Sequence, residues 1–238
     1  MELSLRMKQV ADMVEPCHMI ADVGCDHGYV SIYLIEQGIA EGAIAMDIRP
    51  GPLSRARENV ARKGLQNRIQ CRLSDGLESL KAEEADTIVI AGMGGPLMIG
   101  IIDRGMKREQ KIKTLVLQPQ SEIPEVRRYL HSVGYELVQE HMLYEDGKYY
   151  TVMKATQQKP ASWKPVEYEY GKHLLKERSE VLYQYLRKEY QQLMDLRSEL
   201  QKQNTEKAQK RFQELSVQLE WNREAQKYYE VTKDYELV

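Results

Sequence analysis

Short apolar segments alternate with longer amphipathic segments along the first two thirds of the chain. Five apolar runs have the length and composition of buried strands, and they cover His18 to Gly24, Gly42 to Ile48, Ile69 to Ser74, Asp86 to Ala91 and Thr114 to Gln118. Helical periodicity is found between them, at Tyr29 to Gln37, Pro52 to Lys63, Pro96 to Gly105 and Ile123 to His131. Strands that alternate with helices predict a mainly parallel sheet covered on both faces.

The pattern adds further elements at each end of this alternating region. Leu3 to Val14 reads as a leading amphipathic helix. Glu136 to Leu143 and Tyr149 to Lys154 are strand-like, and the Asp146-Gly147 pair between them is a hairpin signal. We therefore expect residues 1–156 to form an α/β domain whose seven-stranded sheet ends in an antiparallel hairpin.

The residues after a proline-containing linker, Gln157 to Pro165, show no strand signal. Leucines follow one another there at heptad spacing, at Leu175, Leu182, Leu186, Leu193, Leu196 and Leu200. A polar break precedes a second helical pattern, which carries Ala208, Phe212, Leu215 and Leu219. The pattern predicts an α-helical coiled-coil hairpin over residues 166–238. Tyrosines are concentrated in these helices, and we interpret most of them as packing residues rather than platforms for nucleic-acid bases.

Composition limits the classes of partner. The 238 residues contain 34 Lys and Arg against 36 Asp and Glu, so any polyanion must be held by local basic patches rather than by net charge. The 3 cysteines lack the spacing of a zinc site or a disulfide framework, which favours a reduced, cytoplasmic protein without a metal. No apolar run approaches the roughly 18 residues that span a bilayer, so we expect no membrane association.

The first strand is followed by a glycine-containing turn, Asp22-Val-Gly-Cys-Asp-His-Gly28, that opens a helix. Glycine lets a backbone turn tightly and approach a ligand closely. Asp22 stands where a dinucleotide fingerprint has its first glycine, and a carboxylate there suits a cationic amine better than a phosphate. The alternative is a turn with a purely structural role.

The next three strands also end in glycine or carboxylate residues. Asp47 lies 23 residues after Gly24, close to the spacing at which an acid binds ribose hydroxyls. Ser74-Asp75-Gly76 follows the third strand and could hold an adenine through its exocyclic amine, while Ala91 to Gly95 ends the fourth. Because ligands bind α/β sheets at the carboxyl ends of strands, these features together predict one nucleoside-binding site.

These blocks resemble class I S-adenosylmethionine-dependent methyltransferases, which have a Rossmann-like sheet. More narrowly, the chain is similar to the bacterial TrmK family, the tRNA (adenine-22-N1) methyltransferases. The blocks that carry this resemblance are Asp22 to Tyr29, Pro50 to Ser54, Asp75 to Leu77, Ile90 to Gly95, Leu117 to Gln120 and Glu145 to Lys148. The resemblance implies S-adenosyl-L-methionine as cofactor and tRNA as partner. It also implies the helical hairpin at the C-terminal end.

Site residues follow from the strand ends and the resemblance together. We expect cofactor contacts from Asp22, Gly24, Asp26, His27, Gly28, Asp47, Ile48, Asp75, Gly76 and Gly92. We expect substrate contacts from Met93, Gly94, Gly95, Arg104, Lys107 and Arg108, the last three forming a basic patch after the fourth strand. Such a patch is more often only a solvated helix face.

The fourth strand end also bears on the chemistry. Gly92-Met-Gly-Gly-Pro96 stands where methylases of exocyclic amines carry an Asn/Asp-Pro-Pro-aromatic turn, so an endocyclic nitrogen is the more plausible target. Adenine N1 already has a lone pair, and its methylated product is cationic. A carboxylate would stabilise that product. Asp26 is the first catalytic candidate, with His27 and Tyr29 orienting or stacking, although Asp26 could only order the cofactor loop and His27 could only fill the cleft wall.

Two other classes of function remain open. One is a small-molecule methyltransferase whose helical hairpin forms a dimer, and the other is a catalytically silent RNA-binding or protein-binding module. The intact strand-end motifs disfavour a silent module. Our primary hypothesis is a monomeric or weakly associating tRNA methyltransferase.

Overall fold

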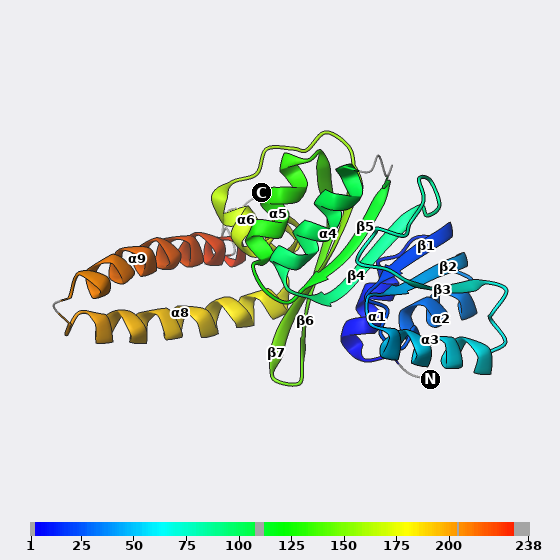
Figure 1. Cartoon of the computed structure of the whole chain (residues 1–238). Helices are drawn as coiled ribbons and strands as arrows, with labels where there is room; N and C mark the ends of the chain where they lie inside the picture. The colour runs from blue at the N-terminus through cyan, green and yellow to red at the C-terminus, as the bar shows by residue number, and fades with distance from the viewer. Residues whose placement is uncertain (1–2, 108–111, 204, 231–238) are drawn as a thin grey trace. The chain divides into compact units, whose positions relative to one another are not determined.

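The computed structural model describes residues 3–107, 112–203 and 205–230, and the chain divides into two compact units, Met1–Ala161 and Ser162–Val238. The first unit contains one seven-stranded sheet with the strand order β3-β2-β1-β4-β5-β7-β6 (Figure 1). Its strands are β1 (Cys17–Val23), β2 (Ala40–Asp47), β3 (Ile69–Leu73), β4 (Thr87–Met93), β5 (Thr114–Pro119), β6 (Tyr135–Glu145) and β7 (Lys148–Gln157). The predicted mainly parallel sheet with an antiparallel hairpin is confirmed, because β7 is antiparallel to both of its neighbours.

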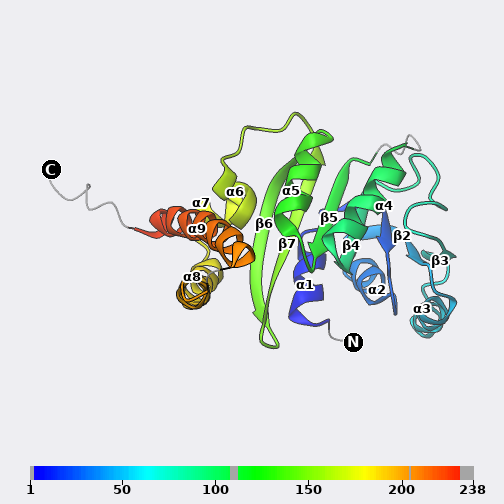
Figure 2. The ribbon, with the colours of Figure 1, turned by 60° about the vertical axis from the view of Figure 1, so that its left-hand side comes forward.

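Helices cover both faces of this sheet. They are α1 (Leu5–Asp12), α2 (Tyr29–Glu36), α3 (Pro50–Arg62), α4 (Gly95–Lys107) and α5 (Ile123–Ser132). The crossovers β1-α2-β2 and β4-α4-β5 run in opposite directions along the sheet, and right-handed connections therefore place α2 and α4 on opposite faces (Figure 2). Helix α1 packs beside α2. All five helices were expected, and their ends differ from the expected ones by at most two residues.

The apolar runs form the interior because both faces of the parallel strands are covered. Ile20, Ile88, Ile90, Leu115 and Leu117, from three adjacent strands, are fully shielded from solvent. The strand order reverses between β1 and β4, because the connection after β1 runs to β2 on one side and the connection after β4 runs to β5 on the other. This reversal opens a crevice at the carboxyl ends of the strands, which is the position where α/β sheets bind ligands.

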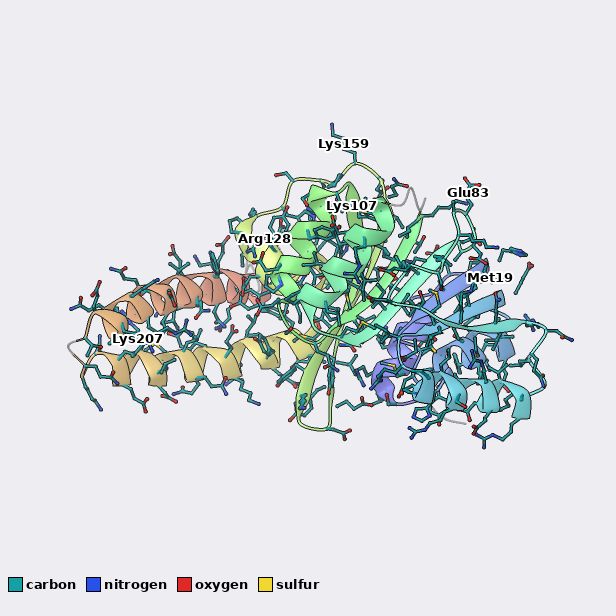
Figure 3. All side chains as sticks on the ribbon, viewed as in Figure 1. Met19, Glu83, Lys107, Arg128, Lys159 and Lys207 are labelled. Carbon is teal, nitrogen blue, oxygen red and sulfur yellow. The ribbon has the colours of Figure 1, made fainter. Side chains whose placement is uncertain are left out.

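The second unit is helical in its described part. It contains α6 (Pro165–Tyr170), α7 (Lys172–Lys176), α8 (Glu180–Leu200), α9 (Glu206–Gln226) and the short 3-10 helix η1 (Lys227–Tyr229). Helices α8 and α9 pack against each other as the expected hairpin, and Leu182 and Leu186 of α8 and Leu215 and Leu219 of α9 are buried. Charged side chains extend from both helices along their length (Figure 3).

The predicted leucine seam is interrupted at its start. Leu175 belongs to α7 rather than to α8, because Arg178 adopts a left-handed conformation with φ of 52° and ends the first helical segment. Leu196, at the far end of the seam, remains 37% exposed. The two short helices α6 and α7 were not predicted, since each is too short to show a periodic apolar pattern.

Candidate functional site

A cleft of about 550 Å³ lies at the carboxyl ends of the central strands. Its size falls within the range typical of small-molecule sites. Most of the predicted site residues line it, namely Asp22, Gly24, Asp26, His27, Tyr29, Asp47, Ile48, Asp75, Gly76, Gly92 and Met93. The ends of β1, β2, β3 and β4 thus contribute to one site.

The turn between β1 and α2 forms one wall of the cleft. The backbone N–H groups of Gly24 and Cys25 both donate to the Met46 carbonyl, at 2.8 and 2.9 Å, which fixes the turn against the end of β2. Gly24 and Gly28 have φ of +72°, a conformation that favours glycine. Gly28 does not line the cleft: a Cβ there would lie 3.3 Å from the Ala56 Cβ, so this glycine serves the packing of α2 against α3.

Asp22 is a buried carboxylate at the start of this turn. It is only 5% exposed, yet it lines the cleft, and its Oδ2 accepts a hydrogen bond of 2.7 Å from the Ser31 hydroxyl. Burial raises the pKa of Asp22 to about 6, and repulsion from Asp47 acts in the same direction. A cationic group bound in the cleft would stabilise the ionised form.

Asp47 lies at the end of β2 and is 4% exposed. Its Oδ1 accepts a bond of 2.8 Å from the Arg49 backbone N–H, and its Oδ2 accepts one of 3.3 Å from the Asp26 backbone N–H. Each carboxylate oxygen has two lone pairs, so both oxygens can accept a further hydrogen bond. Asp47 is therefore fixed by backbone groups while retaining acceptor capacity for hydroxyl groups of a ligand.

Asp26, His27 and Tyr29 form a polar and aromatic set beside the turn. His27 Nε2 lies 3.5 Å from Asp26 Oδ2, and the His27 and Tyr29 rings stack with centroids 5.2 Å apart. Asn59 holds the turn by donating a bond of 2.9 Å to the His27 carbonyl. The Asp26 side chain is 57% exposed. The set presents a carboxylate and a flat aromatic surface to whatever enters the cleft.

Several expected substrate residues lie outside the cleft lining. A Cβ at Gly95 would meet the Ser121 carbonyl at 2.5 Å and one at Gly94 the Ser121 hydroxyl at 3.2 Å, so the lack of a side chain allows the close approach of the loop after β5. Arg104 pairs with Asp75 at 3.3 Å, and Lys107, at the end of α4 (Figure 3), pairs with Asp103. Arg108 lies outside the described residues.

Other residues also line the cleft but were not among the predicted site residues. They are Arg6, Met7, Val23, Cys25, Val30, Arg49, Ser74, Ala91, Leu97, Ile101 and Gln120. Ser74 and Gln120 belong to blocks that were noticed at strand ends. Nothing in the pattern of the leading helix indicates that Arg6 turns toward the sheet edge. Burial and neighbouring carboxylates raise the pKa of the Cys25 thiol, which therefore stays protonated and is no nucleophile.

Within the described ranges, no group of three or more His, Cys, Asp and Glu side chains is placed to hold a metal ion. In the same part of the chain, no helix is long and apolar enough to cross a membrane.

Comparisons with known proteins give a consistent result. Residues 20–231 match the family described as TrmK, tRNA (adenine(22)-N(1))-methyltransferase. The tRNA (adenine(22)-N(1))-methyltransferase of Bacillus subtilis is 39% identical over 155 residues, which are 65% of this chain and 65% of that relative.

Solved structures extend the likeness to nearly the whole chain. The crystal structure of the B. subtilis m1A22 tRNA methyltransferase TrmK superposes with a TM-score of 0.85 and 32% identity, covering 94% of this chain and 98% of that one. The structure of M. capricolum TrmK with S-adenosyl-homocysteine gives 0.85 and 27%, covering 96% and 99%.

Proposed function

Because the chain belongs to the TrmK family of tRNA (adenine(22)-N(1))-methyltransferases, we propose that it transfers a methyl group from S-adenosyl-L-methionine to N1 of adenine 22 in tRNA. One observation carries this proposal: acidic residues from the ends of three adjacent strands, Asp22, Asp47 and Asp75, line a single cleft. A nucleoside joined to an amino acid offers ribose hydroxyls, an exocyclic amine and an ammonium group to these three carboxylates.

The residues of the cleft fit such a cofactor. Asp47 would accept hydrogen bonds from the ribose hydroxyls, because both of its oxygens are oriented by backbone N–H groups. Asp75 and Gly76 would hold the adenine, with Ile48 and Ile101 as apolar walls of the same cleft. Asp22 would face the ammonium end. S-Adenosyl-L-methionine would supply a methyl group that is activated by the positive sulfonium.

The chain's own residues would position the target base and stabilise the charge that appears on it. Adenine N1 needs no strong base, since its lone pair attacks directly, and alignment and exclusion of water contribute most. Tyr29 is 37% exposed and stacks on His27, so the pair could support the face of an inserted base. The Asp26 carboxylate beside them would stabilise the cationic product.

The helical unit would contribute to tRNA binding. A groove of about 930 Å³ in this unit is lined by four cationic side chains and two acidic ones, namely Lys164, Arg197, Arg223, Lys227, Glu220 and Glu224. The buried Nε of Arg197 has no hydrogen-bond partner within the described residues. A groove with excess positive charge suits phosphate groups, so we propose that the protein binds tRNA here. We also propose that the enzyme is monomeric or only weakly associating.

One incubation separates the classes of function. The full-length protein is mixed with S-adenosylmethionine labelled on its methyl group and with unmodified bulk tRNA. We expect label in the tRNA and 1-methyladenosine in its nuclease digest. Cofactor binding without label in tRNA would favour a small-molecule methyltransferase, and absence of cofactor binding would favour a silent module.

A further inference from the structure

Arg6 of α1 reaches the edge of the sheet and lines the cleft. Its Nη1 donates a hydrogen bond of 2.9 Å to Gln118 Oε1, and its guanidinium carbon lies 5.0 Å from the centre of the Tyr150 ring. Gln118 is completely buried at the end of β5, and the same oxygen accepts a bond of 3.1 Å from the Gly92 N–H. The guanidinium is therefore held in place by an amide on one side and an aromatic ring below.

The charge of Arg6 is uncompensated within the described part of the chain. The cleft is lined by four carboxylates, from Asp22, Asp26, Asp47 and Asp75, and by two arginines. Arg49 lies 3.6 Å from Asp47, whereas none of the ion pairs among the described residues involves Arg6. A guanidinium has five N–H donors, and Gln118 occupies only one Nη of Arg6. A fixed cation with unused donors in a ligand cleft is suited to an oxyanion.

The position of Arg6 indicates which oxyanion it binds, on the premise of the proposed function. With ribose at Asp47 and adenine at Asp75, the amino-acid end of the cofactor falls on the side of the cleft near Gly24 and Gly92. Arg6 lies on this side, because its Nη1 is 3.5 Å from where a Cβ on Gly92 would be. S-Adenosyl-L-methionine carries one carboxylate, at that end. We propose that Arg6 binds the carboxylate of the cofactor's methionine portion.

This assignment gives the two ends of the amino-acid portion different partners. The buried Asp22 carboxylate takes the ammonium group, and Arg6 takes the carboxylate. Gly92 has φ of +77° and no side chain, so no side-chain atom of this residue lies between Arg6 and the ligand. The helix that precedes the sheet thereby becomes part of the cofactor site, and the buried Gln118 becomes a positioning residue that orients both Arg6 and the Gly92 N–H.

The test compares two ligands that differ only in this carboxylate. Calorimetry measures binding of S-adenosylhomocysteine and of its decarboxylated analogue to the full-length protein, to Arg6→Met and to Arg6→Lys. Loss of a hydrogen-bonded ion pair corresponds to a factor of about 10 to 100 in affinity. We expect Arg6→Met to weaken S-adenosylhomocysteine by that factor and to leave the decarboxylated analogue within about twofold of wild type, with Arg6→Lys in between.

Arg49→Met is the matched control, because it removes the other arginine of the cleft and should affect both ligands equally. Equal weakening of both ligands by Arg6→Met would overturn the proposal, since Arg6 would then only support α1 and the Gly92 loop. Unchanged affinity for S-adenosylhomocysteine, with a raised KM for tRNA, would also overturn it and would assign Arg6 to an RNA phosphate. Failure of the wild-type protein to bind either ligand would contradict the proposed function instead.

Discussion

The two units of the molecule each hold a carboxylate among polar partners, but they satisfy it differently. In the helical unit, Glu189 accepts hydrogen bonds from Tyr170, Tyr185 and Asn222, at 2.7, 2.8 and 2.9 Å. In the cleft, Ser31 is the one hydrogen-bond donor to Asp22 among the residues that the structure describes, and burial raises the pKa of Asp22 to about 6.

This difference separates a structural group from a candidate binding group. The Glu189 network is closed, and the burial of Tyr170 and Tyr185 next to that carboxylate raises the pKa of both phenols, which stay protonated as donors. Asp22 is poorly compensated and faces a cavity, as expected where a ligand supplies the missing partner. Loss of the Glu189 carboxylate should therefore lower folding stability, whereas loss of the Asp22 charge should raise the stability of the ligand-free protein.

The largest effect is expected from Asp26→Ala in the cleft. If Asp26 stabilises the cationic product, kcat for tRNA methylation should fall by about 100-fold, the scale of a lost electrostatic contact in a transition state. The affinity for S-adenosylhomocysteine, measured by calorimetry, should stay within about threefold. Lost affinity together with lost turnover would reduce Asp26 to a residue that orders the cofactor loop.

Asp47→Ala should act on binding rather than on chemistry. We expect the affinity for S-adenosylhomocysteine to fall by about 50-fold, because two hydrogen bonds between ribose hydroxyls and a carboxylate are lost. The same variant should also unfold at a somewhat lower temperature, because the Arg49 and Asp26 backbone N–H groups lose their acceptor. Unchanged binding in a calorimeter would refute the ribose role of this residue.

Asp22→Asn should stabilise the protein without ligand. A raised carboxyl pKa means that the folded state binds the proton more tightly than the unfolded state, so the free energy of unfolding falls as the pH rises from about 4 to about 6. Above that window the ionised, buried Asp22 costs about 3 kcal/mol, and the amide should recover part of it. Denaturant titrations at pH 4 and pH 7 measure this, and a variant less stable than wild type at pH 7 would contradict it.

Glu189→Leu should lower the stability of the protein, in contrast to Asp22→Asn. Removing the shared acceptor takes one hydrogen bond each from Tyr170, Tyr185 and Asn222, which should cost about 2 kcal/mol of stability in the helical unit. Loss of helical circular dichroism in urea reports this change. The affinity for S-adenosylhomocysteine should remain that of wild type, and a weakened affinity would show that the comparison between the units is wrong.

The smallest effect is expected in the groove of the helical unit. Charge reversal by Arg223→Glu should raise the KM for tRNA by about 3- to 10-fold at low salt and less at high salt, because phosphate contacts are screened. Lys207→Glu is the matched control, since Lys207 is an exposed cation of α9 that does not line this groove (Figure 3). Equal effects of the two variants would point to net charge rather than to the groove.

Much of the fold could be predicted because each strand carries its own signal. Runs such as Thr114 to Gln118 are buried on both faces, and the glycine and carboxylate residues that follow the strands mark the edge of the sheet. Since parallel strands end at one edge, Asp22, Asp47 and Asp75 could be assigned to one site from the sequence alone.

The remaining features depend on tertiary packing that local periodicity does not encode. Arg6 sits in an ordinary amphipathic helix, and only the docking of α1 near the ends of β4 and β5 turns it into a cleft residue. In the sequence, Glu189 is a charged residue at an apolar heptad position. In the structure it is the shared acceptor of a hydrogen-bond network that includes Tyr170 from α6 and Asn222 from α9. Gly94 and Gly95 were expected to contact substrate because they follow the fourth strand. Their packing against Ser121 depends on the loop after β5, which the local pattern does not reveal.

The most direct test of the account is to map the methylated base. Methylation of N1 blocks Watson–Crick pairing, so reverse transcriptase stops at the modified adenine. After incubation with S-adenosylmethionine, we predict a stop at position 22 of a tRNA transcript with the wild-type protein. We predict no stop when adenine 22 is replaced by guanine. A stop at another position, or none with a protein that binds the cofactor, would contradict the account.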